Sequence, residues 1–189
     1  MAPDRRLFIP VILGTPREGR YSEFVARFVI DQVRGNERVE TELLDVRDVA
    51  LMFDDAGEAI KDARFSAIAM RADALILVVP EYNHGYPGIL KHVLDTNLKE
   101  YIHKAVGIVG VSAGPFGGVR MIQNLLPVMR ELGLVNIFWD VNFGNVQTLF
   151  DPDGRILDSA YTRRVDKFLA ELIWMARVLR HGRENIPLE

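Results

Sequence analysis

A loop of small, hydroxylated and cationic residues follows the first apolar segment of the chain. It runs from Gly14 to Ser22 with the sequence GTPREGRYS. Backbone N–H groups and the positive end of the helix that follows favour an anion there, above all a phosphate. Thr15 and Ser22 can donate hydroxyl hydrogen bonds, and Arg17 or Arg20 can pair with a dianion. A solvated turn in which Ser22 only caps the helix is the alternative.

The same loop excludes two common nucleotide sites. It has no Gly-Lys-Ser/Thr, which a nucleoside-triphosphate loop requires, and no glycine fingerprint for a dinucleotide. A phosphate monoester therefore fits the loop better than either ligand.

Two tyrosines and an amide stand in a second loop, residues 80–91, with the sequence PEYNHGYPGILK. Tyr82 and Tyr86 offer flat apolar faces, and Asn83 and exposed backbone amides offer hydrogen bonds. Such a loop can hold a planar heterocycle. The alternative is a rigid turn with surface tyrosines, because turn residues also gather in loops for conformational reasons.

A third loop, residues 111–120, has the sequence VSAGPFGGVR. Its glycines, Gly114, Gly117 and Gly118, allow a backbone to approach a ligand closely. One interpretation is a glycine loop along the edge of a flat cofactor.

The third loop also permits a serine hydrolase. Residues 110–114 match G-x-S-x-G, the nucleophile elbow, with Ser112 as nucleophile between a strand and a helix. Asp151 or Asp158 could supply the acid and His181 the base. However, His181 lies near the end of a long amphipathic stretch, and the chain has no His-Gly-Gly oxyanion segment.

Metal and thiol chemistry find no support in the sequence. The chain has no cysteine, which excludes disulfides, thiolate zinc sites, iron–sulfur clusters and cysteine nucleophiles. The four histidines make no metal-ligand spacing, so we expect no metal: His84, His92, His103 and His181. The absence of cysteine and of a signal peptide favours the cytoplasm.

Charge and hydropathy exclude further classes. There are 23 Lys and Arg against 26 Asp and Glu, a net charge of −3, and no basic run is longer than Arg163-Arg164. We therefore expect no nucleic-acid partner. The longest apolar run, Ala74 to Pro80, is too short to span a membrane. A non-catalytic electron carrier of the flavodoxin type is a further alternative. Such carriers tend to be strongly acidic, and a net charge of −3 would attract a basic partner protein only weakly.

Apolar periodicity predicts the elements that must position these loops. Five short β-branched runs predict buried strands: Leu7 to Leu13, Val39 to Leu44, Ala74 to Val79, Ala105 to Val111 and Leu134 to Trp139. Apolar stripes with helical spacing follow them: Phe24 to Val33, Ile60 to Ile68, Leu90 to Leu94, Ile122 to Leu132 and Val165 to Leu179.

Strands and helices thus alternate five times, which predicts an α/β fold. We expect a doubly wound, five-stranded parallel sheet of flavodoxin-like order 2-1-3-4-5, covered by helices on both faces in three α/β/α layers. Residues 1–189 should form a single domain, since no linker or repeat is present. Ligands bind at the carboxyl ends of such strands, where the three loops lie.

Taken together, the three loops resemble the NADPH-dependent FMN reductase family, which also holds bacterial quinone, chromate and azo-dye reductases. The motifs that carry the resemblance are Gly14-Thr15-x-Arg17, Pro80-Glu81-Tyr82-Asn83 with Pro87-Gly88 and Leu90-Lys91, and Ser112-x-Gly114 with Gly117-Gly118-x-Arg120. The similarity continues through Phe150-Asp151-x-Asp153-Gly154 and covers about Phe8 to Arg180.

The resemblance implies a set of FMN-binding residues. Thr15, Arg17 and Ser22 would hold the phosphate, and Arg20 stands where many relatives have a second small hydroxyl. The flavin ring would be bordered by two groups, Pro80, Glu81, Tyr82 and Asn83 on one side and Ser112, Gly114, Phe116, Gly117 and Gly118 on the other.

The resemblance also implies the reaction and the assembly. NADPH or NADH would deliver hydride to flavin N5, and the electrons would pass to a small-molecule acceptor: a quinone, free flavin, an azo compound or a metal oxyanion. No side chain need act as a catalytic acid or base. A homodimer with the flavin near the interface, sometimes paired into a homotetramer, is expected.

Overall fold

The computed structural model describes residues 5–52 and 57–188. Its first half contains β1 (Leu7–Phe8), β2 (Val11–Leu13), α1 (Ser22–Arg34), β3 (Val39–Glu40), β4 (Leu43–Asp45), α2 (Ala63–Arg71) and β5 (Ala74–Pro80). Its second half contains α3 (Gly88–Asp95), β6 (Lys104–Val111), α4 (Val119–Glu131), β7 (Leu134–Asn136), β8 (Val141–Phe143) and α5 (Ala160–Asn185). Short 3₁₀ turns cover Val46–Asp48, Gly57–Ile60 and Val146–Thr148.

Two of the predicted strands are each split into two segments. Pro10 has no N–H to donate, and it separates β1 from β2. Opposite it, Thr41 separates β3 from β4, and its hydroxyl donates to the Ile9 carbonyl at 2.6 Å. The pairing still continues across the break, because the Ile9 N–H donates to the Glu40 carbonyl at 2.9 Å.

The strand order is roughly that of the prediction, although in the described part of the chain the main sheet contains six strands instead of five because β8 also pairs with β6. The main sheet runs β4-β2-β5-β6-β7 with every pair parallel, which corresponds to the order 2-1-3-4-5. β1 and β3 continue the first two strands as a separate parallel pair. The carboxyl ends of β2, β5 and β6 therefore lie side by side at one edge.

The fifth strand differs from its predicted bounds. The prediction extended it to Trp139, but β7 ends at Asn136 and the chain returns to the sheet as β8, which pairs with the second half of β6. The prediction was wrong here because the apolar Phe138 and Trp139 are not buried. They are 79% and 40% exposed in the connection between the two segments.

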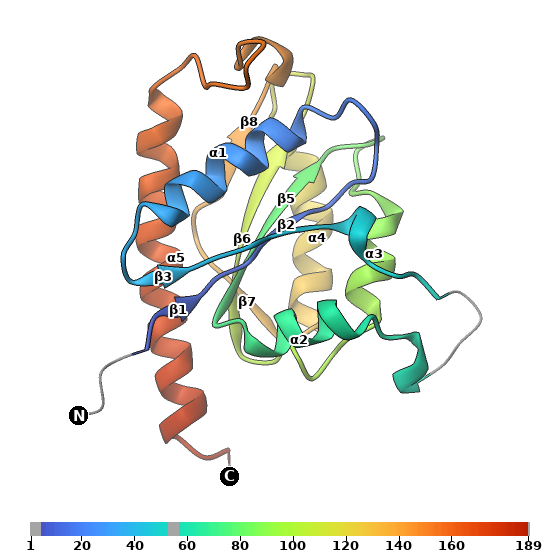
Figure 1. The fold of residues 1–189 in the computed structure, drawn as a ribbon, viewed down its shortest axis with the longest axis vertical. Coiled ribbons are helices and arrows are strands. Elements are labelled where there is room, and N and C mark those ends of the chain that lie inside the picture. Colours follow the sequence, from blue (N-terminus) through green and yellow to red (C-terminus); the bar gives the residue numbers. More distant parts are fainter. Residues whose placement is uncertain (1–4, 53–56, 189) are drawn as a thin grey trace.

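Helices cover both faces of the sheet (Figure 1). Alternate residues of the fully buried β5 face opposite ways: Ile76 packs in the cluster with α1 and α5, while Leu77 packs in the cluster with α2, α3 and α4. Helix α5 lies close on β6, since a Cβ at Gly107 would come within 2.4 Å of the Phe168 ring. This arrangement gives the predicted three layers.

In residues 5–52 and 57–188 we find no helix with the length and apolar character that crossing a membrane requires.

Candidate functional site

The three predicted loops meet around one cavity at the carboxyl edge of the sheet. Its volume is about 390 Å³. The residues that line it come from all three loops and from the turn after β8: Arg17, Glu18, Gly19, Arg20, Tyr21, Ser22, Pro80, Glu81, Tyr82, Val111, Ser112, Ala113 and Val146.

Two hydroxyls stand at the phosphate loop. Thr15 is fully buried, and its Oγ1 lies 3.0 Å from the Tyr82 hydroxyl, which joins the first loop to the second. Ser22 is the first residue of α1, and among the residues that the structure describes its buried Oγ has no hydrogen-bond partner. Tyr21, which precedes the helix, gives it no side-chain cap. A buried hydroxyl at an uncapped helix N-terminus is suited to an anionic ligand.

The two predicted phosphate arginines are placed differently. Arg20 is buried: its guanidinium forms an ion pair with Asp45 at the end of β4 and donates to the Thr15 carbonyl. It therefore fixes the loop against the sheet. Arg17 is exposed, and its guanidinium carbon lies 5.8 Å from the centre of the Tyr82 ring. This arrangement leaves Arg17 as the cation able to reach a bound anion.

A second arginine that sequence reasoning missed also holds this loop. Arg47 donates from Nε to the Pro16 carbonyl and from Nη2 to the Arg17 carbonyl, both at 2.7 Å. Its own N–H donates to Asp45 at 3.0 Å. The signal was available in principle, because Arg47 directly follows the strand that pairs with β2.

The second loop is a tight reversal. Tyr82 and Gly85 exchange backbone hydrogen bonds of 2.9 Å, and between them Asn83 and His84 have φ of 50° and 68°. Two consecutive left-handed residues are typical of a type I′ turn, which tolerates Asn well. Asn83 is exposed at the tip. Tyr86, by contrast, is half-buried against the core rather than open to a ligand.

Glu81 ties the second loop to the third. Its buried carboxylate accepts from Arg120 Nε at 2.8 Å and from the Met121 N–H at 3.5 Å, in the first turn of α4. A carboxylate there also interacts favourably with the helix dipole. Arg120 lies 5.5 Å from the ring centre of Phe116, which is 61% exposed.

Glycine stands at the three positions of the third loop for different physical reasons. At Gly117, with φ of 59°, a Cβ would lie 2.7 Å from Asn142, and at Gly118, with φ of 85°, it would lie 3.0 Å from Gly110. Packing against β8 and β6 therefore accounts for both. Gly114 has open space in the Cβ direction, while its carbonyl accepts from the Asn145 N–H at 2.9 Å and from the Ser112 hydroxyl at 2.8 Å.

The serine hydrolase hypothesis is not supported. Ser112 Oγ donates to the Gly114 carbonyl at 2.8 Å instead of to a histidine. His181 lies 3.3 Å from the Asn185 amide within α5. Asp151 and Asp158 accept hydrogen bonds from backbone N–H groups in their own turns. The residues of the proposed triad are thus engaged elsewhere.

Comparison with known proteins now decides the family. Residues 8–148 match the family model of NADPH-dependent FMN reductases. The chain belongs to the NADPH-dependent FMN reductase family. It is an FMN-dependent reductase that uses a reduced nicotinamide donor, and the resemblance noted from the three loops is confirmed. The hypothesis of a non-catalytic electron carrier is not supported.

Individual FMN reductase relatives agree with this assignment. The chain is 31% identical over 120 residues to an NADPH azoreductase of Bacillus sp. strain OY1-2, an alignment that covers 61% of this chain and 64% of that protein. It is 30% identical over 159 residues to a quinone reductase of Pseudomonas putida strain KT2440, with coverage of 79% and 84%.

A solved structure of a flavoenzyme has the same fold. The NAD(P)H:(acceptor) oxidoreductase FerB from Paracoccus denitrificans superposes with a TM-score of 0.74 at 20% identity, covering 90% of this chain and 98% of that one. This likeness supports the flavodoxin-like three-layer architecture.

The residues at the cavity fit FMN on two observations of this structure. The unpartnered Ser22 hydroxyl beside the uncapped α1 terminus suits the phosphate. The open space in the Cβ direction of Gly114, next to the cavity-lining Ala113, suits the edge of a planar ring. Both features lie in loops that meet at the same sheet edge.

Proposed function

We propose that FMN binds in the carboxyl-edge cavity with its phosphate at the start of α1 and its ring between the second and third loops. The unpartnered buried Oγ of Ser22 carries this proposal, because a phosphate oxygen would satisfy it. Thr15 and Arg17 would complete the phosphate site. Arg20 would act through Asp45 to hold the loop.

The proposed ring site uses the remaining predicted residues. Pro80, Glu81, Tyr82 and Asn83 would border one side, and Ser112, Gly114, Phe116, Gly117 and Gly118 the other. Their roles differ: Glu81, Gly117 and Gly118 shape the loops, whereas Gly114 and Asn83 expose backbone to the ring.

Bound FMN would supply the redox chemistry, which is hydride uptake from NADPH or NADH and electron transfer to a second substrate. The chain's own residues would orient the flavin and exclude water from it. The Tyr82 hydroxyl is fixed by Thr15, so the loop keeps its position. Backbone dipoles of the second and third loops would stabilise negative charge on the flavin ring. The protein contributes no catalytic acid or base in this proposal.

The acceptor is a small organic molecule, an azo compound or a quinone, as the names of the two relatives suggest. The exposed Phe116 ring beside Arg120 offers a flat apolar surface next to a positive charge for such an acceptor.

The wider setting is part of the same proposal. The chain would act as one domain in the cytoplasm, as a homodimer or homotetramer. The exposed Phe116 and Val119 beside the cavity, 61% and 43% accessible, favour a partner subunit near the flavin.

One spectroscopic experiment tests the central claim. Purified protein is titrated with FMN, and NADPH is then added without oxygen. We expect saturable binding with a visible flavin spectrum that bleaches on NADPH addition. Protein that stays colourless through the titration would refute FMN binding, and bound flavin that NADPH fails to reduce would indicate a carrier.

A further inference from the structure

A second cavity of about 390 Å³ lies at the opposite edge of the sheet, between β1, the turn after α1 and α5. Five arginines and one glutamate line it: Arg5, Arg6, Arg38, Arg177, Arg180 and Glu37. β5 rises about 3.3 Å per residue over its 7 residues. The two cavities are therefore separated by roughly the length of that strand, and this one is independent of the flavin site.

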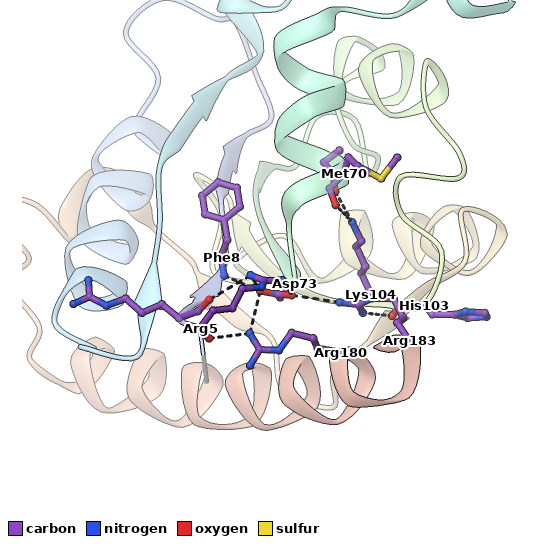
Figure 2. A network of polar contacts seen from close by, with 10 residues as sticks. Arg5, Phe8, Met70, Asp73, His103, Lys104, Arg180 and Arg183 are labelled. Atoms are coloured by element: carbon purple, nitrogen blue, oxygen red, sulfur yellow. Dashed lines mark hydrogen bonds and ion pairs between the residues drawn. The ribbon is translucent and has the colours of Figure 1, made fainter. Parts of the chain in front are cut away.

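Three arginines gather around one buried carboxylate behind this cavity (Figure 2). Asp73, 1% exposed, is held by two 2.9 Å hydrogen bonds from Arg5, and Arg180 and Arg183 lie 3.7 and 3.4 Å from its oxygens. One buried carboxylate therefore faces three guanidinium groups. The nearby Lys104 has its pKa lowered to about 8, chiefly by burial and also by the charge of Arg183.

Three further arginines line the cavity itself. Across the parts of the chain that the structure describes, the side chains of Arg6, Arg38 and Arg177 take part in no ion pair. Each is exposed. Convergent positive charges on a chain of net charge −3 attract an anion. The planar guanidinium groups suit the paired oxygens of a phosphate.

The space beyond the arginines is large enough for more than a phosphate. A neighbouring hollow of about 560 Å³ shares Glu37, Arg38 and Ile173 with the cavity. Gln32 and Asn36 line it with amide donors and acceptors, and Glu37 and Asp166 line it with carboxylates that can accept hydrogen bonds from hydroxyl or amino groups. Arginines at one end and hydrogen-bonding side chains at the other, with the apolar Ile173 shared by both hollows, match the parts of a nucleotide.

We propose that this arginine cavity is a second binding site, which takes a phosphorylated small molecule of nucleotide size. The phosphate lies among Arg6, Arg38 and Arg177, and the remainder of the ligand extends along Ile173 toward Gln32 and Asn36. The site is separate from the proposed flavin site. If this second proposal fails, the proposed reductase function is unaffected.

Calorimetric titration of the FMN-loaded protein with AMP, adenosine and inorganic phosphate tests the site. We expect AMP to bind at least about tenfold more tightly than inorganic phosphate, and adenosine to bind at least about tenfold more weakly than AMP. R38A/R177A should weaken AMP binding by about tenfold or more, because two charge-assisted contacts are removed. Equal affinity for AMP and phosphate would overturn the assigned ligand size.

A matched control removes the same charge elsewhere. Arg64 and Arg163 are also exposed arginines, so R64A/R163A should leave AMP affinity unchanged. The flavin spectrum reports folding and the reductase site in every variant. Absence of AMP binding to the parent protein, or equal loss in both double variants, would overturn the proposal even when the flavin spectrum is normal.

Discussion

At the scale of single residues, two hydroxyls of the phosphate loop have different partners. Thr15 is bonded to Tyr82, whereas Ser22 is buried without a partner. An unsatisfied buried hydroxyl costs about 1–3 kcal/mol, and a ligand oxygen removes that cost. We therefore expect Ser22 to destabilise the flavin-free protein and to contribute to binding when FMN occupies the proposed site.

The variant Ser22→Ala should separate these two effects. In flavin-free protein we expect the free energy of unfolding to stay equal or rise by up to about 1 kcal/mol, because no hydrogen bond is lost. FMN affinity should fall about tenfold. Urea unfolding and flavin fluorescence titration measure the two quantities. A clear loss of stability in the flavin-free variant would contradict an unpartnered Ser22.

A pair of variants compares Arg17 with Ser112. Arg17→Ala should weaken FMN retention about tenfold, since it removes the exposed cation of the phosphate loop. Ser112→Ala should leave reductase turnover largely intact, because its hydroxyl bonds only to Gly114. Turnover lost at full flavin occupancy in the Ser112 variant would show that this serine takes part in the reaction.

Among the helices and strands, those that follow from apolar periodicity and turn chemistry were predicted from the sequence. β5 and β6 are continuous apolar runs, so their positions and the loops after them were predicted closely. The return of the chain as β8 was missed, because Val141–Phe143 is short and alternating. Contacts of Arg47 and Asp45 with the first loop were also missed, since they join residues 25 to 31 positions apart in the chain.

The glycine loop before α4 allows a test at this scale. Gly117→Ala should lower the free energy of unfolding by about 2 kcal/mol, because φ is positive and the added Cβ would meet Asn142. Gly114→Ala should change stability little, since its Cβ would point into open space, but it should weaken FMN binding. Thermal unfolding and flavin titration of both variants check this; equal destabilisation would contradict it.

In the whole molecule, the two opposite edges of the sheet differ in their chemistry. The carboxyl edge has hydroxyls, glycines and aromatic rings, and the amino edge has a buried network of charges around Asp73. Lys104 lies in that network and donates to the carbonyls of Ala69 and Met70 at 2.7 Å. Its pKa is lowered to about 8 from 10.5.

This lowered pKa has a consequence for stability against pH. Between about pH 8 and pH 10.5 the unfolded chain keeps the Lys104 proton while the folded chain loses it, so this residue makes stability rise with pH. The contribution is at most about 1.4 kcal/mol per pH unit. Urea unfolding gives the free energy of unfolding of wild type and of Lys104→Met at each pH in this range. The difference, wild type minus variant, should increase with pH, with a slope below about 1.4 kcal/mol per pH unit. A negative slope would contradict the assignment.

The Asp73 network also determines how the molecule can be mounted on a support. Arg5 near one end of the chain and Arg183 near the other both contact Asp73, so both terminal segments are anchored at the amino edge (Figure 1). Immobilisation through either segment would point the three loops of the carboxyl edge, where we propose that FMN binds, outward from the support. An electrode or bead coated in this way would keep the redox face open to dissolved reagents.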